Sequence, residues 1–108
     1  MLTTNNNGRV NFKTCFPGWY PGRTIHIHYA ISNKIGEISV VSQLCFTDKI
    51  AHDICTKHEL YRKRGEQDTP LSSGRDVVFP SRGYEDFVAS TQRNSDGTLL
   101  AYHTIQVK

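Results

Sequence analysis

The chain has 108 residues, a length that supports one domain, and its 37% hydrophobic and 21% charged residues are ordinary for a globular protein. The formal net charge is only +3, and the densest basic stretch, KHELYRKR at 57–64, is interrupted by a glutamate and a leucine, so we expect a solvated surface there and no nucleic-acid partner. No apolar run approaches the length of a membrane span, and residues 1–10 lack the apolar segment of a signal peptide. The sequence as written therefore predicts a soluble chain without a membrane partner, cytoplasmic unless an export signal lies upstream of Met1.

The first half of the chain predicts three strands. VNFKTCF at 10–16 alternates apolar and polar residues, as do TIHIHYAI at 24–31 and ISVVSQLCF at 38–46. PGWYPG at 17–22 places two Pro-Gly pairs around two aromatic residues, which predicts a structured loop leading into the second strand.

A short helix is predicted next. Thr47 is a suitable N-cap for DKIAHDIC at 48–55, which carries an aspartate in its first turn. From 56 to 83 the sequence is polar and contains Gly and Pro, and DVVF at 76–79 is the one piece that we expect to be ordered.

Two further strands close the chain. They are predicted at about 86–92 and 98–107, on either side of the hairpin-turn sequence NSDG. The total is five or six strands and one short helix, which favours a β-sandwich or an open barrel.

The second strand carries two histidines on one face. His26 and His28 alternate with isoleucine and tyrosine, so both imidazoles project to the same side of the strand, opposite an apolar face. Residues at i and i+2 lie close enough to become neighbouring ligands of one metal ion. The cysteines do not suggest a metal site or a disulfide framework, because their spacing forms no zinc-ligand pair and their number is odd: Cys15, Cys45 and Cys55.

Tyr20 is the best candidate for a third ligand. It lies six residues before His26, in the Pro-Gly loop that leads into the histidine strand. A tyrosinate is a hard anionic oxygen donor suited to ferric iron. Arg23, three residues before His26, places a fixed positive charge beside the site. Packing beside Trp19 is the alternative role for Tyr20.

These residues carry a family resemblance. GRVNFKTCFPGWYPGRTIHIHYAI, followed by SQLCF with its glutamine fifteen residues after His28, resembles the core of the intradiol ring-cleavage dioxygenases, the family of the catechol and protocatechuate enzymes. The likeness is dense over 8–46, and SDGTLLAYHTIQV near the end resembles the closing strand of the family. The fold class implied is mostly β: an incomplete Ig-like β-sandwich of the intradiol dioxygenase type with one short helix, with residues 1–108 as a single domain.

The resemblance implies a non-haem Fe(III) cofactor. Tyr20 and His28 correspond to the two axial ligands, and His26 corresponds to an equatorial ligand. In the family, a catecholic substrate binds as a dianion and displaces the axial tyrosinate, which takes up a substrate proton. Dioxygen then attacks the ring, and cleavage between the two hydroxyl-bearing carbons gives a diacid.

Two further residues correspond to groups that line the substrate. Arg23 and Gln43 match positions that stabilise charge developing on the ring, a role that generally contributes strongly to catalysis. Trp19 corresponds to pocket wall or scaffold. The resemblance thus implies an oxidoreductase in the breakdown of aromatic compounds, with a catechol and dioxygen as partners.

The sequence departs from the family in one ligand. The family iron has a second tyrosine, upstream of the first strand seen here, and no residue in 1–7 can supply it. We expect a C-terminal portion of a longer protein, impaired on its own; a natural short chain with an altered or absent metal site is the alternative. The remaining tyrosines are candidate substitutes, although Tyr29 points away from the histidines: Tyr29, Tyr61, Tyr84 and Tyr102.

Two other functions stay open. The chain could be a non-catalytic β-domain that retains the family loop, or it could hold a different ion, such as zinc or Fe(II), on the two histidines. An incomplete sandwich leaves apolar faces and strand edges uncovered, which favours pairing as a homodimer. The sequence does not identify the substrate.

Overall fold

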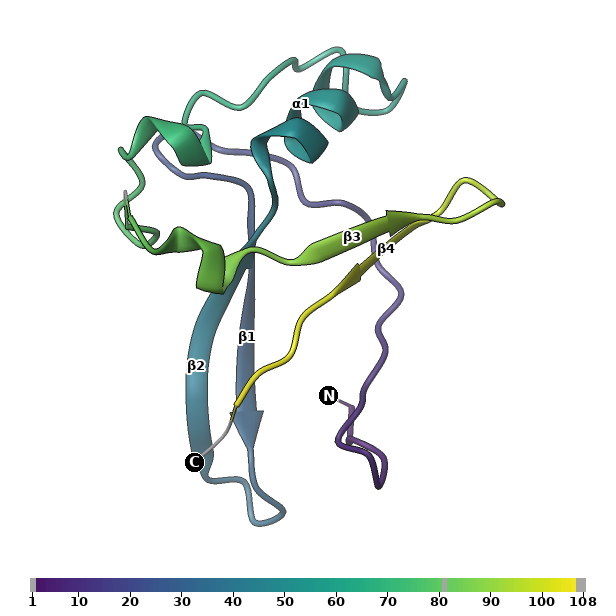
Figure 1. Cartoon of the computed structure of the whole chain (residues 1–108), viewed down its shortest axis with the longest axis vertical. Coiled ribbons are helices and arrows are strands. Elements are labelled where there is room, and N and C mark those ends of the chain that lie inside the picture. The colour runs from purple at the N-terminus through teal and green to yellow at the C-terminus, as the bar shows by residue number, and fades with distance from the viewer. Residues whose placement is uncertain (1, 81, 107–108) are drawn as a thin grey trace.

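A computed structural model describes residues 2–80 and 82–106. Its elements, in chain order, are β1 (His26–Ser32), β2 (Ile38–Cys45), α1 (Asp48–Lys57), two short 3₁₀ helices (Leu71–Ser73 and Tyr84–Phe87), β3 (Ser90–Arg93) and β4 (Leu99–Tyr102). The strands form two separate antiparallel hairpins, β1–β2 and β3–β4. The long β1–β2 hairpin runs along the molecule, α1 lies at one of its ends, and the shorter hairpin extends across it (Figure 1).

The β1–β2 hairpin separates the two faces that the alternation predicts. Ile27, Tyr29 and Ile31 are half-buried, whereas the residues between them along the strand, beginning with His28, are exposed. His28 lies directly opposite Gln43 in the ladder, so these two side chains share one face. The register therefore places a histidine and the predicted glutamine next to each other.

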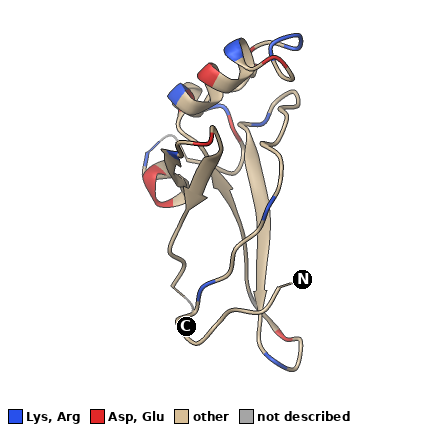
Figure 2. Ribbon diagram, turned by 90° about the vertical axis from the view of Figure 1, so that its right-hand side faces the viewer, with Lys and Arg blue, Asp and Glu red and all other residues tan. Residues whose placement is uncertain are grey.

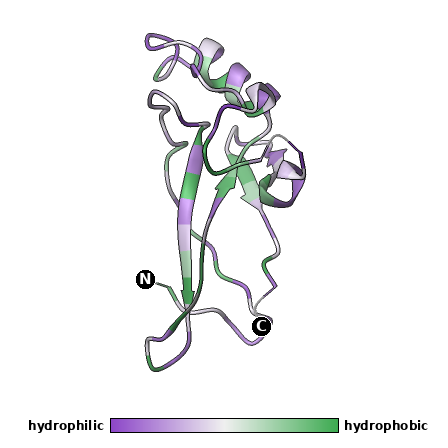
Figure 3. Ribbon diagram, turned by 90° about the vertical axis from the view of Figure 1, so that its left-hand side faces the viewer, coloured by the Kyte–Doolittle hydropathy of each residue, from purple (hydrophilic) through white to green (hydrophobic). Residues whose placement is uncertain are grey.

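The helix α1 forms where its N-cap predicts. The Thr47 hydroxyl accepts a hydrogen bond from the Ile50 N–H at 3.3 Å, and Asp48 lies in the first turn. One face of the helix is buried through Ala51, Ile54 and Cys55. Apolar and polar residues alternate around it (Figure 3), which is typical of a helix that packs on a core by one side.

Two small clusters form the core. One joins the start of β1 to α1 and to the residue before β3: Ile25, Phe46, Ala51, Cys55 and Ala89. The other joins the end of β2 to the segment after α1: Cys45, Leu71 and Phe79. Both clusters lie at the end of the hairpin where β1 begins, the end that also carries His26.

The predicted strand at 10–16 is not formed. No other strand in the described part of the chain pairs with it, and Phe12 remains 68% exposed. Without a neighbouring strand, alternation alone leaves the backbone N–H and C=O groups without ladder partners, so an extended segment does not become a sheet strand. The structure therefore has four strands within the described residues, where five or six were predicted.

The last two strands are shorter than predicted. Gly83 adopts a left-handed conformation with φ of 78°, and Tyr84–Phe87 then forms a 3₁₀ turn, so β3 starts only at Ser90. β4 ends at Tyr102, and residue 107, the last of the predicted strand, lies outside the described residues.

Charged residues of both signs are mixed along α1 and the segment after it (Figure 2). Among residues 2–80 and 82–106, no helix has the length and apolar content needed to span a membrane.

The buried Phe79 ring should contribute strongly to stability. It is 1% exposed and packs near Phe87, with 5.8 Å between ring centroids. We expect Phe79→Ala to lower the free energy of unfolding by about 3–5 kcal/mol, because it leaves a cavity. Phe12→Ala, at an exposed ring, should change it by less than about 0.5 kcal/mol. Urea denaturation measures both variants, and equal losses would contradict this core.

Candidate metal centre

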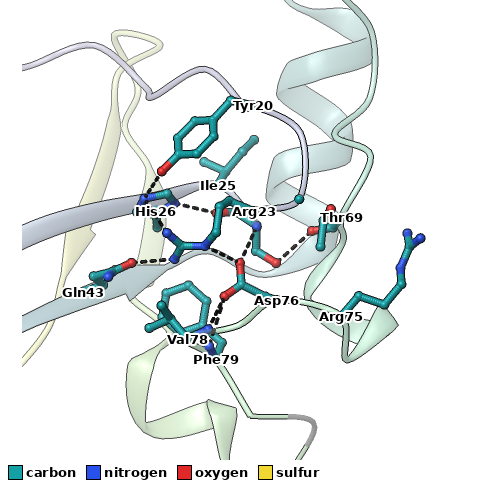
Figure 4. A network of polar contacts seen from close by, with 12 residues as sticks. Tyr20, Arg23, Ile25, His26, Gln43, Thr69, Arg75, Asp76, Val78 and Phe79 are labelled. Carbon is teal, nitrogen blue, oxygen red and sulfur yellow. Dashed lines mark hydrogen bonds and ion pairs between the residues drawn. The ribbon is translucent and has the colours of Figure 1, made fainter.

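A tight turn sets the position of Tyr20. The Arg23 N–H donates to the Tyr20 carbonyl at 3.3 Å, and Pro21 and Gly22 are the two central residues. Gly22 has φ of 83°, a conformation that residues with a Cβ rarely adopt and that this type of turn requires after proline. The chain thus reverses immediately before β1, and the Tyr20 ring lies over the start of that strand (Figure 4).

Two side chains, those of Tyr20 and His28, converge on one nitrogen atom of His26. The Tyr20 hydroxyl lies 3.0 Å from His26 Nε2, and His28 Nε2 lies 3.1 Å from the same atom. Figure 4 shows the phenol directed at His26. Tyr20 and His28 are not hydrogen-bonded to each other in the described structure, so His26 is the residue that lies between them.

The backbone fixes the tautomer of His26. Its Nδ1 lies 2.7 Å from the Thr24 carbonyl oxygen, which can only accept, so Nδ1 carries the proton and Nε2 presents a lone pair. Burial lowers the pKa of His26 below its ordinary value of 6.5, and the nearby charge of Arg23 acts in the same direction. A neutral imidazole with its lone pair directed at Tyr20 and His28 is the form that binds metals.

The donor set could hold a metal ion as well as a set of hydrogen bonds. Three groups surround a single lone pair on His26 Nε2, since Arg23 Nη1 is also 3.4 Å away. Two ligands that each bind one ion at ~2.1 Å and at right angles lie about 3 Å apart, so the separations of 3.0 and 3.1 Å are compatible with binding of one shared ion. A phenol oxygen with two imidazole nitrogens suits iron. Among the described residues no group of three His, Cys, Asp and Glu side chains could hold a metal, so the candidate set depends on the tyrosine.

Arg23 lies beside this set and is bound on two other sides. Its Nε donates to the Asp76 carboxylate at 2.9 Å, and its Nη2 donates to the Gln43 side-chain oxygen at 2.6 Å. The guanidinium is largely buried, with 14% of the side chain exposed. The structure therefore brings together all five residues that the sequence singled out: Tyr20, Arg23, His26, His28 and Gln43.

Asp76 is the residue of this site that the sequence analysis did not identify. Its side chain is 1% exposed and also accepts from the backbone N–H groups of Thr24, Val78 and Phe79, at 2.7, 2.8 and 3.1 Å. Burial by itself raises the pKa of Asp76, but these N–H groups and Arg23 together lower it below its ordinary value. The sequence contained one indirect signal for such an acid, namely Arg23, because a guanidinium that is buried in a core requires a buried acid as its partner.

The other candidate ligands have different partners. The Tyr61 hydroxyl donates to the Phe16 carbonyl at 2.8 Å, and Tyr102 is an exposed residue of β4. Cys45 lies opposite His26 in the ladder, but burial raises the pKa of its thiol to about 12, so it remains a neutral thiol, a poor ligand. Within the described residues, Tyr20 is the one tyrosine in contact with either histidine of β1.

Trp19 has a structural role. Its indole N–H donates to the Gly65 carbonyl at 3.0 Å, and the Arg64 guanidinium lies over its ring, 4.2 Å from the centroid. The ring also packs against the core cluster that contains Ile25 and Phe46, and these contacts favour the scaffold role over the pocket wall.

The site lies on an open face. Tyr20 is 46% exposed and His28 is also exposed. Two surface hollows occur beside α1, one lined by Asp48, His52 and Glu66 and the other by Thr47, Leu71 and Tyr84 among others, and neither includes the three candidate ligands. Two of the three candidate ligands, Tyr20 and His28, are thus accessible to solvent in the described part of the chain.

Comparison with known proteins finds similarity to one class of protein, through its structure. No family model and no curated protein matches the sequence. The fold does match part of the fold of the intradiol ring-cleavage dioxygenases, a class of oxidoreductases. The matching structure is the intradiol ring-cleavage dioxygenase from Tetranychus urticae, with a TM-score of 0.81 and 28% sequence identity over 96% of this chain and 50% of that one.

This match confirms the family resemblance inferred from the sequence. It also confirms that the two hairpins and the helix follow part of that fold. The chain spans half the length of the solved structure that it matches.

Ionised Asp76 should make stability depend on pH. Because its pKa in the folded chain lies below the ordinary value of 3.8, its carboxylate stabilises the fold above that pH, and the contribution is lost as the pH falls through the lowered pKa. We expect the free energy of unfolding to fall between roughly pH 5 and pH 3, and to fall less steeply in Asp76→Asn. Urea denaturation across this range measures the slopes, with Asp53→Asn, at a surface carboxylate, as the control. Parallel curves for the wild type and Asp76→Asn would rule out this role.

Proposed function

We propose that this chain carries the ferric site of an intradiol ring-cleavage dioxygenase. Tyr20, His26 and His28 hold Fe(III), and the substrate is a catecholic aromatic ring cleaved by dioxygen between its two hydroxyl-bearing carbons. The observation that carries the proposal is the convergence of the Tyr20 oxygen and the His28 nitrogen on His26 Nε2, at 3.0 and 3.1 Å. The match to the Tetranychus urticae dioxygenase supports it independently.

Each residue has a role that follows from its chemistry. When bound, Fe(III) supplies Lewis acidity that lowers the pKa values of phenols, including that of a catechol. The Tyr20 oxygen is then a base that can accept a substrate proton at a half-exposed position. His26, held as the neutral tautomer by Thr24, contributes a nitrogen of fixed direction.

Arg23 acts on the substrate side. A guanidinium next to the ligand cluster can pair with the negative charge that develops on the ring, and this charge stabilisation is preorganised because Asp76 and Gln43 both hold the group. Gln43, opposite His28 in the ladder, keeps its side-chain oxygen on Arg23. These contacts support the catalytic roles that the resemblance implies for Arg23 and Gln43.

The proposed architecture is part of an Ig-like β-sandwich in a single domain over residues 1–108. The family iron has a further tyrosine ligand, and the described residues bring no second tyrosine to the site. The chain also spans half of the matched dioxygenase, and its site lies on an open face. We therefore propose that the chain binds iron and catechol but turns catechol over slowly unless additional residues complete the site.

A non-catalytic domain is the second candidate, and the open face with its missing tyrosine favours it. The two candidates differ in their response to iron. A protein loaded with Fe(III) whose visible spectrum changes on addition of catechol, with oxygen uptake and a ring-opened diacid as product, is the dioxygenase. A colourless protein that retains no iron is the non-catalytic domain, and retention of zinc or Fe(II) alone would assign the histidines to a different ion.

Tyr20→Phe tests the anionic ligand. We expect the iron-loaded wild type to absorb visible light through tyrosinate-to-iron charge transfer, and Tyr20→Phe to lose this band, because no other described tyrosine contacts the histidines. Tyr102→Phe, at an exposed tyrosine of β4, is the matched control and should keep the band. Absorption spectra at equal iron content make the comparison; a band that survives in Tyr20→Phe would disprove the assignment of this ligand.

His28→Ala tests the imidazole donors. Loss of one of three ligands should lower the affinity for Fe(III) by at least about tenfold to a hundredfold, the loss seen when only the groups that support metal ligands are removed. His58→Ala removes a histidine whose Nδ1 accepts from the Leu60 N–H, and it should leave the iron content unchanged. Metal analysis after dialysis measures both, and equal iron retention by the two variants would remove His28 from the site.

A further inference from the structure

Asp76 divides its two carboxylate oxygens between two tasks. Oδ1 accepts from the N–H groups of Val78 and Phe79 and so closes a turn within its own segment. Oδ2 accepts from Arg23 Nε and from the Thr24 N–H, 53 and 52 residues away in sequence. One side chain therefore attaches the 76–79 segment to the residues that lead into β1 (Figure 4).

This contact fixes the orientation of a rigid group. A guanidinium is planar, so holding Nε on Asp76 and Nη2 on Gln43 determines the direction of Nη1. That third nitrogen points to His26, 3.4 Å from Nε2. The Phe79 ring lies 6.0 Å from the guanidinium carbon and limits the space into which Arg23 could swing.

The contact also balances charge. Arg23 places a full positive charge beside the atoms proposed to bind a cation, and a like charge at this distance opposes cation binding. The Asp76 carboxylate lies 2.9 Å from Arg23 Nε and compensates that charge. Because the Asp76 side chain is only 1% exposed, water has little access to this contact. Without Asp76, the guanidinium would be both unpaired and free to change its orientation.

We propose that Asp76 is a positioning residue of this site, which holds and neutralises the Arg23 guanidinium so that it faces a catecholate bound next to His26. This inference rests on the proposed function, because it assigns Asp76 a part in substrate binding. Asp76 is not hydrogen-bonded to the ligand cluster itself: its proposed effect on the substrate passes through Arg23, whereas its bond to the Thr24 N–H holds the backbone next to His26.

Asp76→Asn is the direct test. The amide keeps an oxygen for the Val78 and Phe79 N–H groups but turns an NH₂ group toward the Arg23 and Thr24 donors. Asp68→Asn is the matched control: it removes an exposed carboxylate that accepts from the Gly22 N–H and has no contact with Arg23. The readout is the affinity of the Fe(III)-loaded 108-residue chain for 4-nitrocatechol, followed by the absorbance of the probe, with thermal unfolding measured in parallel.

We expect Asp76→Asn to weaken 4-nitrocatechol binding by about tenfold or more, the scale of a misplaced positioning group, and Asp68→Asn to leave it within about twofold. Arg23→Gln should weaken it to a similar degree. Adding Asp76→Asn to Arg23→Gln should then cause no further loss, since residues that act as a unit are not additive.

The outcomes separate the inference from the proposed function. If the wild type binds neither iron nor 4-nitrocatechol, the proposed function is wrong and the inference falls with it. If the wild type binds both and Asp76→Asn binds equally well, only the inference is wrong. If Asp76→Asn does not fold, Arg23→Gln is compared with the double variant, which buries no unpaired cation; equal affinities support the inference, and a further loss in the double variant overturns it.

Discussion

The buried ion pair between Arg23 and Asp76 is the interaction on which the arrangement of the site depends. It joins the loop before β1 to a segment that has no regular secondary structure, and breaking such a pair from one side typically destabilises a protein by about 3–5 kcal/mol. The pair lies between the two core clusters: Ile25 belongs to one of them and Phe79 to the other. The charge pair therefore orients Arg23 and also holds together the halves of a small core.

Local sequence patterns predicted the helix and the first hairpin correctly, because helix capping and side-chain alternation act between residues that are close in sequence. Thr47 caps α1 as its position predicts, and the alternation around His26 gives β1 its two faces. The segment at 10–16 shows the limit of such reasoning. Its alternation is as regular as that of β1, but a strand also requires a partner, and no pattern within seven residues shows whether one is present. β3 was predicted to begin too early, because Tyr84–Phe87 forms a 3₁₀ turn directly after Gly83, which has a left-handed conformation.

The part of the candidate site whose residues are close in sequence, or are paired in one hairpin, was predictable. Tyr20, Arg23, His26 and His28 fall within nine positions, and Gln43 lies opposite His28 once β1 and β2 pair. Asp76 was not predictable in this way. DVVF suggested an ordered segment, but nothing in those four letters indicates that the carboxylate reaches an arginine 53 positions earlier. Contacts over such separations depend on the folded chain as a whole.

These long separations have a consequence for how the site forms. The loop before β1 is held by contacts with Gln67, Thr69 and Asp76, which lie between 42 and 53 residues away. Closing a loop of that size carries an entropic cost of about 3–4 kcal/mol, so these contacts form only when the chain between them has already collapsed. A peptide limited to the tyrosine turn and the histidine strand would contain every proposed ligand and still lack the orienting framework. The tyrosine turn and the histidine strand therefore take up their relative arrangement only together with the segment at 67–76, so the proposed site is a product of tertiary folding and not of its local sequence alone.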